Sequence, residues 1–206
     1  MKIKYKKKNF LIVLIAPSGG GKSTILSKII EKNKNIVYSV SYTTRPVRGN
    51  EKNGVDYFFV SEEEFLKLKE QGEFLETAKV HGNYYGTSKS YIEKMIDEGK
   101  HVIMDIDVQG ADAVIDAGFD NVSIFILPPT EDVLKKRLTE RGTDSSEAIE
   151  VRLKNSKKEI EKIPDYQYLI INDELETAIE EISYIIKAEE NKTKRYLDTY
   201  KKFYGE

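Results

Sequence analysis

Short runs of consecutive apolar residues, separated by longer segments with helical spacing, set the pattern of this chain. Four such runs cover residues 10–15, 102–106, 122–127 and 168–171, and residues 36–40 form a fifth. Continuous apolar runs of this length are typical of strands buried on both faces, and intervening helices favour a parallel sheet. We therefore predict an α/β fold with a parallel five-stranded core sheet flanked by helices.

The segments between these runs carry helix signals. The first predicted helix opens at Lys22, after the first run, and ends near Asn33. Start and stop residues predict further helices from Ser61 to Gly72, Ser90 to Gly99, Thr130 to Gly142, Asp144 to about Glu161 and Asp173 to about Ala188. Residues 41–100 begin with a polar and aromatic stretch that breaks the strand-helix alternation. We interpret this part as an insertion into the core.

Composition narrows the class of protein. A chain of 206 residues suits one compact domain, and a formal net charge of -2 gives no overall attraction to nucleic acid. The absence of cysteine excludes disulfides and cysteine-bound zinc. No run approaches the roughly 18 apolar residues of a membrane span. We expect a cytoplasmic protein with no nucleic-acid or membrane partner.

The N-terminal residues 1–8 hold five lysines and precede the first apolar run, as in a secretory signal. We reject that interpretation because cleavage after the run would destroy the glycine-rich segment that follows it. Residues 1–8 are instead expected to form a solvated basic tail.

That glycine-rich segment, Ala16 to Thr24, is typical of a phosphate-binding loop. Three successive glycines let backbone N–H groups converge on an anion, and the following helix adds the positive end of its dipole. Lys22 would reach the outer phosphates of a nucleotide, and the Ser23 hydroxyl would hold Mg²⁺. The expected ATP-binding residues of this loop are Pro17, Ser18, Gly19, Gly20, Gly21, Lys22, Ser23 and Thr24. The usual pattern has glycine where this chain has Ala16, and a plain turn is the alternative.

Two arginines, Arg45 and Arg48, flank the Pro46-Val47 turn and follow a run of hydroxyl residues. Guanidinium groups this close suit one phosphate, because their planar donors pair with two oxygens at once. Solvated arginines in a surface loop are the alternative.

Several motifs together carry a family resemblance. They are Thr43-Thr44-Arg45, the segment Gly82 to Gly86, Asp105-Ile106-Asp107 followed by Gln109-Gly110, Arg141-Gly142 and the phosphate loop. With them the chain resembles guanylate kinase over residues 10–190, a family in which alanine often replaces the first loop glycine. The resemblance implies a P-loop kinase with a nucleotide-binding core of residues 9–40, 100–128 and 163–206. It also implies a GMP-binding insertion at 41–99 and a helical lid at 129–162.

The resemblance also implies a guanine site, and the chemistry agrees. Guanine presents two adjacent donors, N1–H and the 2-amino group, beside the acceptor O6, so its site needs carboxylates next to hydroxyl donors. Glu76 and Asp107 supply the carboxylates, and Ser41 and Thr87 supply the hydroxyls. The GMP phosphate would contact Arg45, Arg48, Tyr57 and Tyr85. For each tyrosine, a packing role is the alternative.

The two aspartates follow an apolar strand at the sheet edge where ligands bind in open α/β folds. By resemblance Asp107 reaches guanine, whereas Asp105 organises Mg²⁺ together with Ser23. Helix capping is the alternative for either aspartate. The division of labour between the two stays open.

The expected catalytic residues are Lys22, Arg137, Arg141, Arg152 and Asp105. The family closes its lid over the triphosphate, which would bring these arginines onto the transferring group, although surface ion pairs are the alternative. Asn172 matches a position near adenine, and a helix cap is equally open. His81 and His101 suggest packing or exposure and no metal site.

The resulting expectation is a guanylate kinase that uses Mg²⁺ and ATP, has GMP as its second substrate and needs no other cofactor. The alternatives are a non-catalytic module that binds phosphorylated peptides and a kinase for another nucleoside monophosphate. The oligomeric state is left open.

Overall fold

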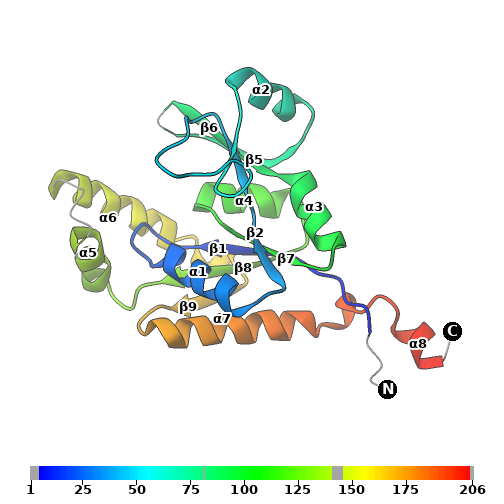
Figure 1. Ribbon diagram of the computed structural model, residues 1–206. Helices are drawn as coiled ribbons and strands as arrows, with labels where there is room; N and C mark the ends of the chain where they lie inside the picture. The colour runs from blue at the N-terminus through cyan, green and yellow to red at the C-terminus, as the bar shows by residue number, and fades with distance from the viewer. Residues whose placement is uncertain (1–4, 81, 141–145, 205–206) are drawn as a thin grey trace.

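A five-stranded parallel sheet forms the centre of the molecule, as the apolar runs predicted. The computed structural model describes residues 5–80, 82–140 and 146–204. The strand order is β2-β7-β1-β8-β9 (Figure 1). The strands are β1 (Leu11–Ile15), β2 (Ile36–Tyr38), β7 (His101–Asp105), β8 (Asn121–Leu127) and β9 (Tyr168–Ile171). Because β1 is the central strand, the phosphate loop that follows it leaves from the middle of the sheet.

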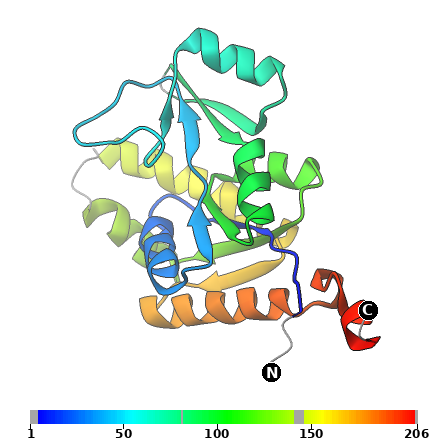
Figure 2. The ribbon, with the colours of Figure 1, turned by 45° about the vertical axis from the view of Figure 1, so that its right-hand side comes forward.

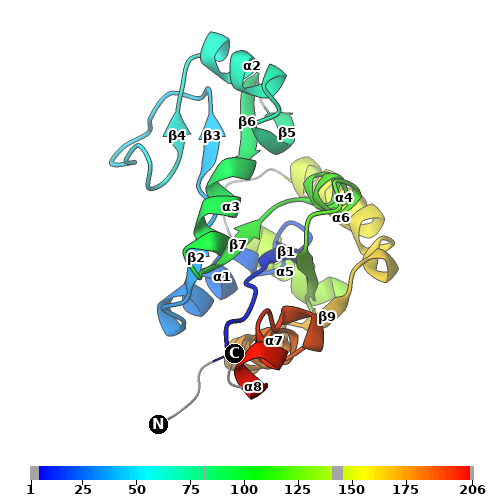
Figure 3. The ribbon, with the colours of Figure 1, turned by 90° about the vertical axis from the view of Figure 1, so that its right-hand side faces the viewer.

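Helices cover both faces of this sheet, and side-chain alternation along β1 shows why. Helices α1 (Lys22–Lys32) and α7 (Leu175–Glu190) lie on one side, and α3 (Lys89–Asp97) and α4 (Val108–Asp116) lie on the other (Figure 3). Ile12 and Leu14 pack in the cluster beneath α1 and α7, whereas Val13 and Ile15 pack in the opposite cluster. All four are fully buried. Each such side chain contributes about 1.5–3 kcal/mol relative to exposure.

Two details of the core differ from the sequence prediction. Strand β9 was expected to be buried on both faces, but Leu169 and Ile171 are 45% and 44% exposed. It is an edge strand, and an apolar run does not reveal its place in the sheet. Helix α4 (Val108–Asp116) was not predicted, because it begins within the Asp105 to Gly110 motif, which was interpreted chiefly as a ligand site.

The inserted region forms a second sheet with its own small core. Its strands are β3 (Ser41–Thr43), β4 (Phe58–Phe59), β5 (Phe74–Val80) and β6 (Asn83–Ser88), in the order β4-β3-β6-β5. Together with α2 (Glu62–Glu70) it lies on the far side of the central sheet from α7 (Figure 2). The ring of Phe65 stacks on Phe74 at a centroid distance of 4.6 Å. This core holds the strands that carry the candidate guanine residues.

The predicted helix starts are right at two positions and wrong at a third. Ser61 accepts a hydrogen bond from the Glu64 N–H, and Thr130 Oγ1 accepts one from the Val133 N–H. Helix α3 begins at Lys89, earlier than expected, because its N-cap is Ser88 and not Ser90. Gly142 and Asp144, the predicted boundary between the next two helices, lie outside the described residues.

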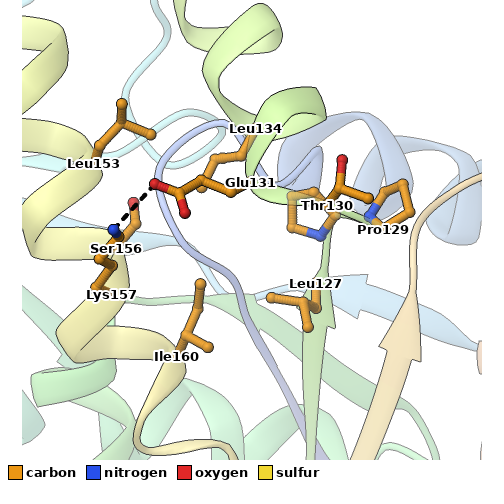
Figure 4. Close-up of a pocket in the computed structure, with 10 residues that line it drawn as sticks. Leu127, Pro129, Thr130, Glu131, Leu134, Leu153, Ser156, Lys157 and Ile160 are labelled. Carbon is orange, nitrogen blue, oxygen red and sulfur yellow. Dashed lines mark ion pairs between the residues drawn. The ribbon is translucent and has the colours of Figure 1, made fainter.

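Helices α5 (Glu131–Glu140) and α6 (Ser146–Ile160) enclose an apolar pocket of about 200 Å³ against the end of β8 (Figure 4). An ion pair of 3.1 Å between Lys157 and Glu131 links the two helices at this pocket. The short helix η1 (Ile163–Asp165) then leads into β9.

The backbone of the described part of the N-terminal segment pairs with the C-terminal part of the chain, while Lys6 and Lys8 stay exposed. The Lys8 N–H donates to the carbonyl of Arg195 at 2.7 Å, and Lys7 and Tyr196 form an antiparallel bridge. These partners belong to η2 (Thr193–Arg195) and the segment before α8 (Thr199–Tyr204). His101 is buried in packing, as expected, whereas His81 lies outside the described residues. Within the described ranges, no helix combines the length and apolar character needed to cross a bilayer.

Candidate active site

The phosphate loop connects β1 to α1 and depends on its glycines. Gly21 precedes the first residue of α1 with a φ of +91°, a region that favours glycine. An ideal Cβ at Gly21 would lie 2.4 Å from Nδ2 of Asn172, and one at Gly20 would lie 2.9 Å from Cβ of Ala16. Ala16 therefore fits at the start of the loop because position 20 has no side chain. Ser18, Ser23 and Thr24 are exposed at the mouth of the loop, whereas Pro17, Gly19 and Gly20 are buried.

Lys22 turns from the start of α1 towards the end of β7. Its Nζ donates to the carbonyl of Ile106 at 2.7 Å. Burial lowers the pKa of Lys22, and the charges of Asp105, Asp107 and Glu159 oppose that shift. The ammonium group is thus held in place beside the loop by a carbonyl and nearby carboxylates. An anionic phosphate at this position would offset the free-energy cost of burying the Lys22 ammonium group.

Asn172 and Arg137 form the wall of the loop opposite Lys22. Asn172 is 4% exposed, and its Nδ2 donates to the carbonyl of Gly20 at 2.8 Å. Nη2 of Arg137 donates to the carbonyl of Asn172 at 3.0 Å, and Nη1 is buried without a hydrogen-bond partner in the described part of the chain. The helix-cap alternative for Asn172 is wrong, because Glu174 occupies the cap position of α7.

A cleft of about 320 Å³ opens beside this wall. Its lining is Gly19, Gly21, Thr24, Arg137, Glu140, Asn172, Asp173 and Leu175. The cleft brings the loop glycines together with Arg137 and Asn172, which both lie more than 100 residues further along the chain. The unpaired Nη1 of Arg137 provides the cleft with a hydrogen-bond donor for an anionic ligand.

The two aspartates at the end of β7 have different surroundings. Asp105 is half-buried, and its Oδ1 accepts a hydrogen bond of 2.7 Å from the hydroxyl of Tyr38. Asp107 is exposed, and its Oδ1 accepts from the Gly110 N–H at 2.8 Å as the cap of α4. The capping alternative therefore holds for Asp107 but not for Asp105. Capping engages one carboxylate oxygen of Asp107 and leaves the other for a ligand.

Three candidate guanine residues meet on neighbouring strands of the inserted sheet. Ser41 pairs with Thr87 across β3 and β6, and Thr87 pairs with Glu76 across β6 and β5. The Thr87 hydroxyl donates to Oε1 of Glu76 at 2.7 Å. Burial is the main cause of a raised Glu76 pKa, and the charge of Asp107 raises it further. The Asp107 charge therefore lies near enough to Glu76 to act on its carboxylate.

The arginine turn has a partner that the sequence did not indicate. Both terminal nitrogens of Arg45 donate to the Glu51 carboxylate, at 3.0 and 2.8 Å, and Arg45 is 6% exposed. The Arg45 guanidinium also lies 5.3 Å from the ring centroid of Tyr57. Tyr57 in turn packs edge-on against Tyr85, at 6.1 Å between centroids. Glu51 thus fixes the orientation of the Arg45 guanidinium next to the rings of Tyr57 and Tyr85.

The remaining predicted residues are less closely gathered. The Arg48 side chain is exposed, and its backbone N–H donates to Oε2 of Glu51 at 2.8 Å. Arg152 is half-buried on α6. Arg141 lies outside the described residues.

Three further residues at the site were missed: Tyr38, Glu51 and Glu159. Glu159, in the last turn of α6, interacts electrostatically with Lys22 and Asp107, and burial raises its pKa. The position of Tyr38 within the predicted strand at residues 36–40 was the only local signal among the three. Glu159 is recognised only once α6 is folded against the phosphate loop, and Glu51 only once the turn that follows Arg45 is folded.

Comparisons with known proteins agree with this geometry. A family model described as guanylate kinase matches residues 8–189. A guanylate kinase of Thermotoga maritima is 44% identical over 196 residues, which span 95% of this chain and 95% of that protein. A guanylate kinase of Clostridium perfringens is 45% identical over 194 residues, 94% of this chain and 90% of that protein. The crystal structure of guanylate kinase from Anaplasma phagocytophilum has a TM-score of 0.74 and 38% identity, covering 95% of this chain and 93% of that one.

The phosphate loop on a central parallel strand, next to a second sheet with a polar ligand site, defines a P-loop kinase of the nucleoside monophosphate class. The chain belongs to the guanylate kinase family. The expected resemblance is therefore confirmed over nearly the whole chain.

Proposed function

We propose that this chain transfers the γ-phosphoryl group of ATP to GMP and gives ADP and GDP. The observation that carries the proposal is the position of Asp107. Its charge acts both on Lys22, in the phosphate loop, and on Glu76, in the inserted sheet. Lys22 also donates to the carbonyl of Ile106, the residue before Asp107, at 2.7 Å. This arrangement supports a donor phosphate site next to a base-binding carboxylate, as phosphoryl transfer between two nucleotides requires.

On the donor side, the loop N–H groups and Lys22 bind the phosphates, and the cleft beside Arg137 and Asn172 takes the adenosine part of ATP. Lys22 is poised because its ammonium is already desolvated, so its attraction to a phosphate oxygen is weakly screened. Arg137 offers its unpaired Nη1 to the same anion.

Mg²⁺ fits the oxygen donors present at this site. The exposed Ser23 hydroxyl and the half-buried Asp105 carboxylate are hard ligands of the kind that Mg²⁺ takes beside phosphates, directly or through water. When bound, the ion would neutralise charge on the phosphate oxygens. Asp105 and Ser23 would hold it in register with the loop.

On the acceptor side, Glu76 and Asp107 accept hydrogen bonds from the guanine N1–H and 2-amino groups, and Ser41 and Thr87 contribute hydroxyls. Adenine would place a lone pair at N1 against these carboxylates, which leaves a buried charge without a partner. Arg45, Arg48, Tyr57 and Tyr85 bind the GMP phosphate. Glu51 fixes the orientation of the planar Arg45 guanidinium for this contact.

Transfer itself needs positioning and charge neutralisation more than proton chemistry. The acceptor is a phosphate oxygen that is already anionic, so the reaction requires no general base. The helical lid, residues 129–162, carries Arg137, Arg141 and Arg152, which stabilise the charge that spreads over the phosphoryl oxygens. Lid closure also excludes water, which would otherwise hydrolyse ATP.

The test is product analysis of the purified chain incubated with ATP, Mg²⁺ and GMP. Formation of GDP and ADP in equal amounts supports the proposal. ATP consumption without GDP would contradict it, and tight GMP binding without any turnover would indicate a non-catalytic phosphate-binding module.

A further inference from the structure

Tyr38 is the last residue of β2 and lies outside every motif that carried the family resemblance. Its hydroxyl donates a hydrogen bond of 2.7 Å to Oδ1 of Asp105, two strand positions beyond its own register partner on β7, Ile103. Among the described residues, Tyr38 is the one whose side chain donates a hydrogen bond to the Asp105 carboxylate. We propose that Tyr38 is a positioning residue that orients the Asp105 carboxylate for Mg²⁺ and the phosphates of ATP.

The backbone of Tyr38 is anchored on two sides. Its carbonyl accepts a hydrogen bond of 3.2 Å from the Tyr91 hydroxyl, and the next N–H, of Ser39, donates to Ile103 at 2.8 Å. The Tyr38 ring packs against the hydrophobic cluster beneath α1 and α7. A donor held this rigidly restricts its acceptor, because the phenol cannot follow a rotating carboxylate.

The restriction matters because a carboxylate on a short side chain rotates freely about its last torsion. With Oδ1 held by Tyr38, the second oxygen of Asp105 has one preferred direction. Asp105 also interacts electrostatically with Lys22, so the same orientation sets the spacing between the carboxylate and the phosphate-binding ammonium.

Replacing Tyr38 by phenylalanine removes this hydrogen bond and keeps the ring in the core. The inference rests on the role proposed above for Asp105. Removing the hydrogen-bond partner of a metal-organising ligand typically costs 10–100-fold in metal affinity or activity. We expect Tyr38→Phe to lower kcat about tenfold, with KM for GMP changed less than about twofold, and to raise the half-saturating Mg²⁺ concentration severalfold.

A binding measurement separates positioning from a general structural effect. Calorimetry with ADP should show weaker binding to Tyr38→Phe in the presence of Mg²⁺ and unchanged binding in excess chelator. The matched control is Tyr168→Phe, which removes a phenol-carboxylate hydrogen bond of 2.6 Å to Glu189, away from the loop. This control should behave as wild type in all three measurements.

A double variant tests whether Tyr38 acts through Asp105, so that the conclusion does not depend on the stability of the single variant Tyr38→Phe. If Tyr38 acts through Asp105, adding Tyr38→Phe to Asp105→Asn should change kcat and Mg²⁺ dependence by less than about twofold. Wild-type Mg²⁺ dependence in Tyr38→Phe, or an equal loss of ADP affinity with and without Mg²⁺, would overturn the inference. If Asp105→Asn itself leaves Mg²⁺ dependence unchanged, the role of Asp105 fails, and the inference fails with it, while GMP turnover by the wild-type chain stands as a separate result.

Discussion

The Thr87 hydroxyl donates a hydrogen bond of 2.7 Å to Oε1 of Glu76 across the β5–β6 pair. This contact orients the carboxylate in a half-buried position, where a charged group is costly without a ligand. The Glu76 carboxylate is therefore held in position to accept hydrogen bonds from a base that presents donors.

Replacing Glu76 with glutamine tests whether this carboxylate binds the guanine donors. The amide keeps the shape and one acceptor, but it presents N–H groups where guanine also presents donors. We expect kcat/KM for GMP to fall about 10- to 100-fold, the effect of leaving one or two buried donors unpaired. The matched control is Glu73→Gln, because Glu73 also accepts a hydroxyl hydrogen bond, from Ser88 at 2.6 Å, outside the site. An equal loss in both variants would contradict the recognition role of Glu76.

The raised pKa of Glu76 predicts a pH dependence of GMP binding. Guanine needs the ionised carboxylate, and burial moves its protonation to a higher pH than the roughly 4.3 of a free glutamate. KM for GMP should therefore rise as the pH is lowered from 7 towards 5, and this dependence should weaken in Glu76→Gln. Steady-state kinetics over that range, with Asp107→Asn as a comparison for the neighbouring carboxylate, makes the measurement.

The raised pKa of Glu76 also predicts how the stability of the folded chain depends on pH. At pH 7 the Glu76 carboxyl is ionised in the folded and unfolded chain, and burial disfavours the charge only in the folded state. Any stability that Glu76 contributes is present below its unfolded pKa and is lost as the pH rises through its folded pKa. Glu76→Gln should thus melt at or above the wild-type temperature at pH 7, with the difference shrinking towards pH 4. A difference that grows on acidification would contradict the assigned direction.

Gly21→Ala tests the contact between the loop and Asn172. An alanine there meets Nδ2 of Asn172 at 2.4 Å and must also adopt a φ of +91°. We expect KM for ATP to rise at least about tenfold, together with a lower melting temperature, because Asn172 or the loop must move. Gly118→Ala is the matched control, since Gly118 has a φ of +69° but open space around it. That control should lose only about 2–4 °C of melting temperature, the effect of about 1 kcal/mol of backbone strain, and keep its kcat.

Lys22→Met separates catalysis from folding. Methionine fills similar space without the charge, so kcat should fall at least about a thousandfold through loss of phosphate stabilisation. Burial lowers the pKa of Lys22, which means that the folded state disfavours this charge at pH 7. The melting temperature should therefore be unchanged or higher. Lys28→Met, at a cation on the same helix that pairs with Glu31, should keep wild-type kcat, and retained activity in Lys22→Met would defeat the mechanism.

Local sequence patterns were sufficient for the phosphate loop and for all five core strands. A buried strand needs only a short apolar run, and the loop needs only glycines and Lys22 placed between a strand and a helix. The role of Ala16 was anticipated from the family resemblance, and the structure supplies the reason in the missing side chain of Gly20.

Contacts between distant segments were not predictable in the same way. Tyr38 reaches Asp105 because β2 and β7 are neighbours, an order that no local pattern contains. The pairing of Arg45 with Glu51 was also missed, because it depends on how the intervening turn folds. The pairing of residues 5–8 with the C-terminal segment was likewise invisible, because lysines by themselves indicate only solvation.

The most direct test of the central claim is the acceptor specificity of the wild-type chain. A coupled assay with ATP and Mg²⁺ gives kcat/KM for GMP, AMP and UMP under one set of conditions. Paired carboxylates that face the guanine donors predict a preference for GMP over AMP and UMP of at least about a thousandfold, because a mismatched base leaves buried polar groups unpaired. Comparable values for GMP and AMP, or a preference for UMP, would contradict the assignment of Glu76 and Asp107 as the groups that read the base.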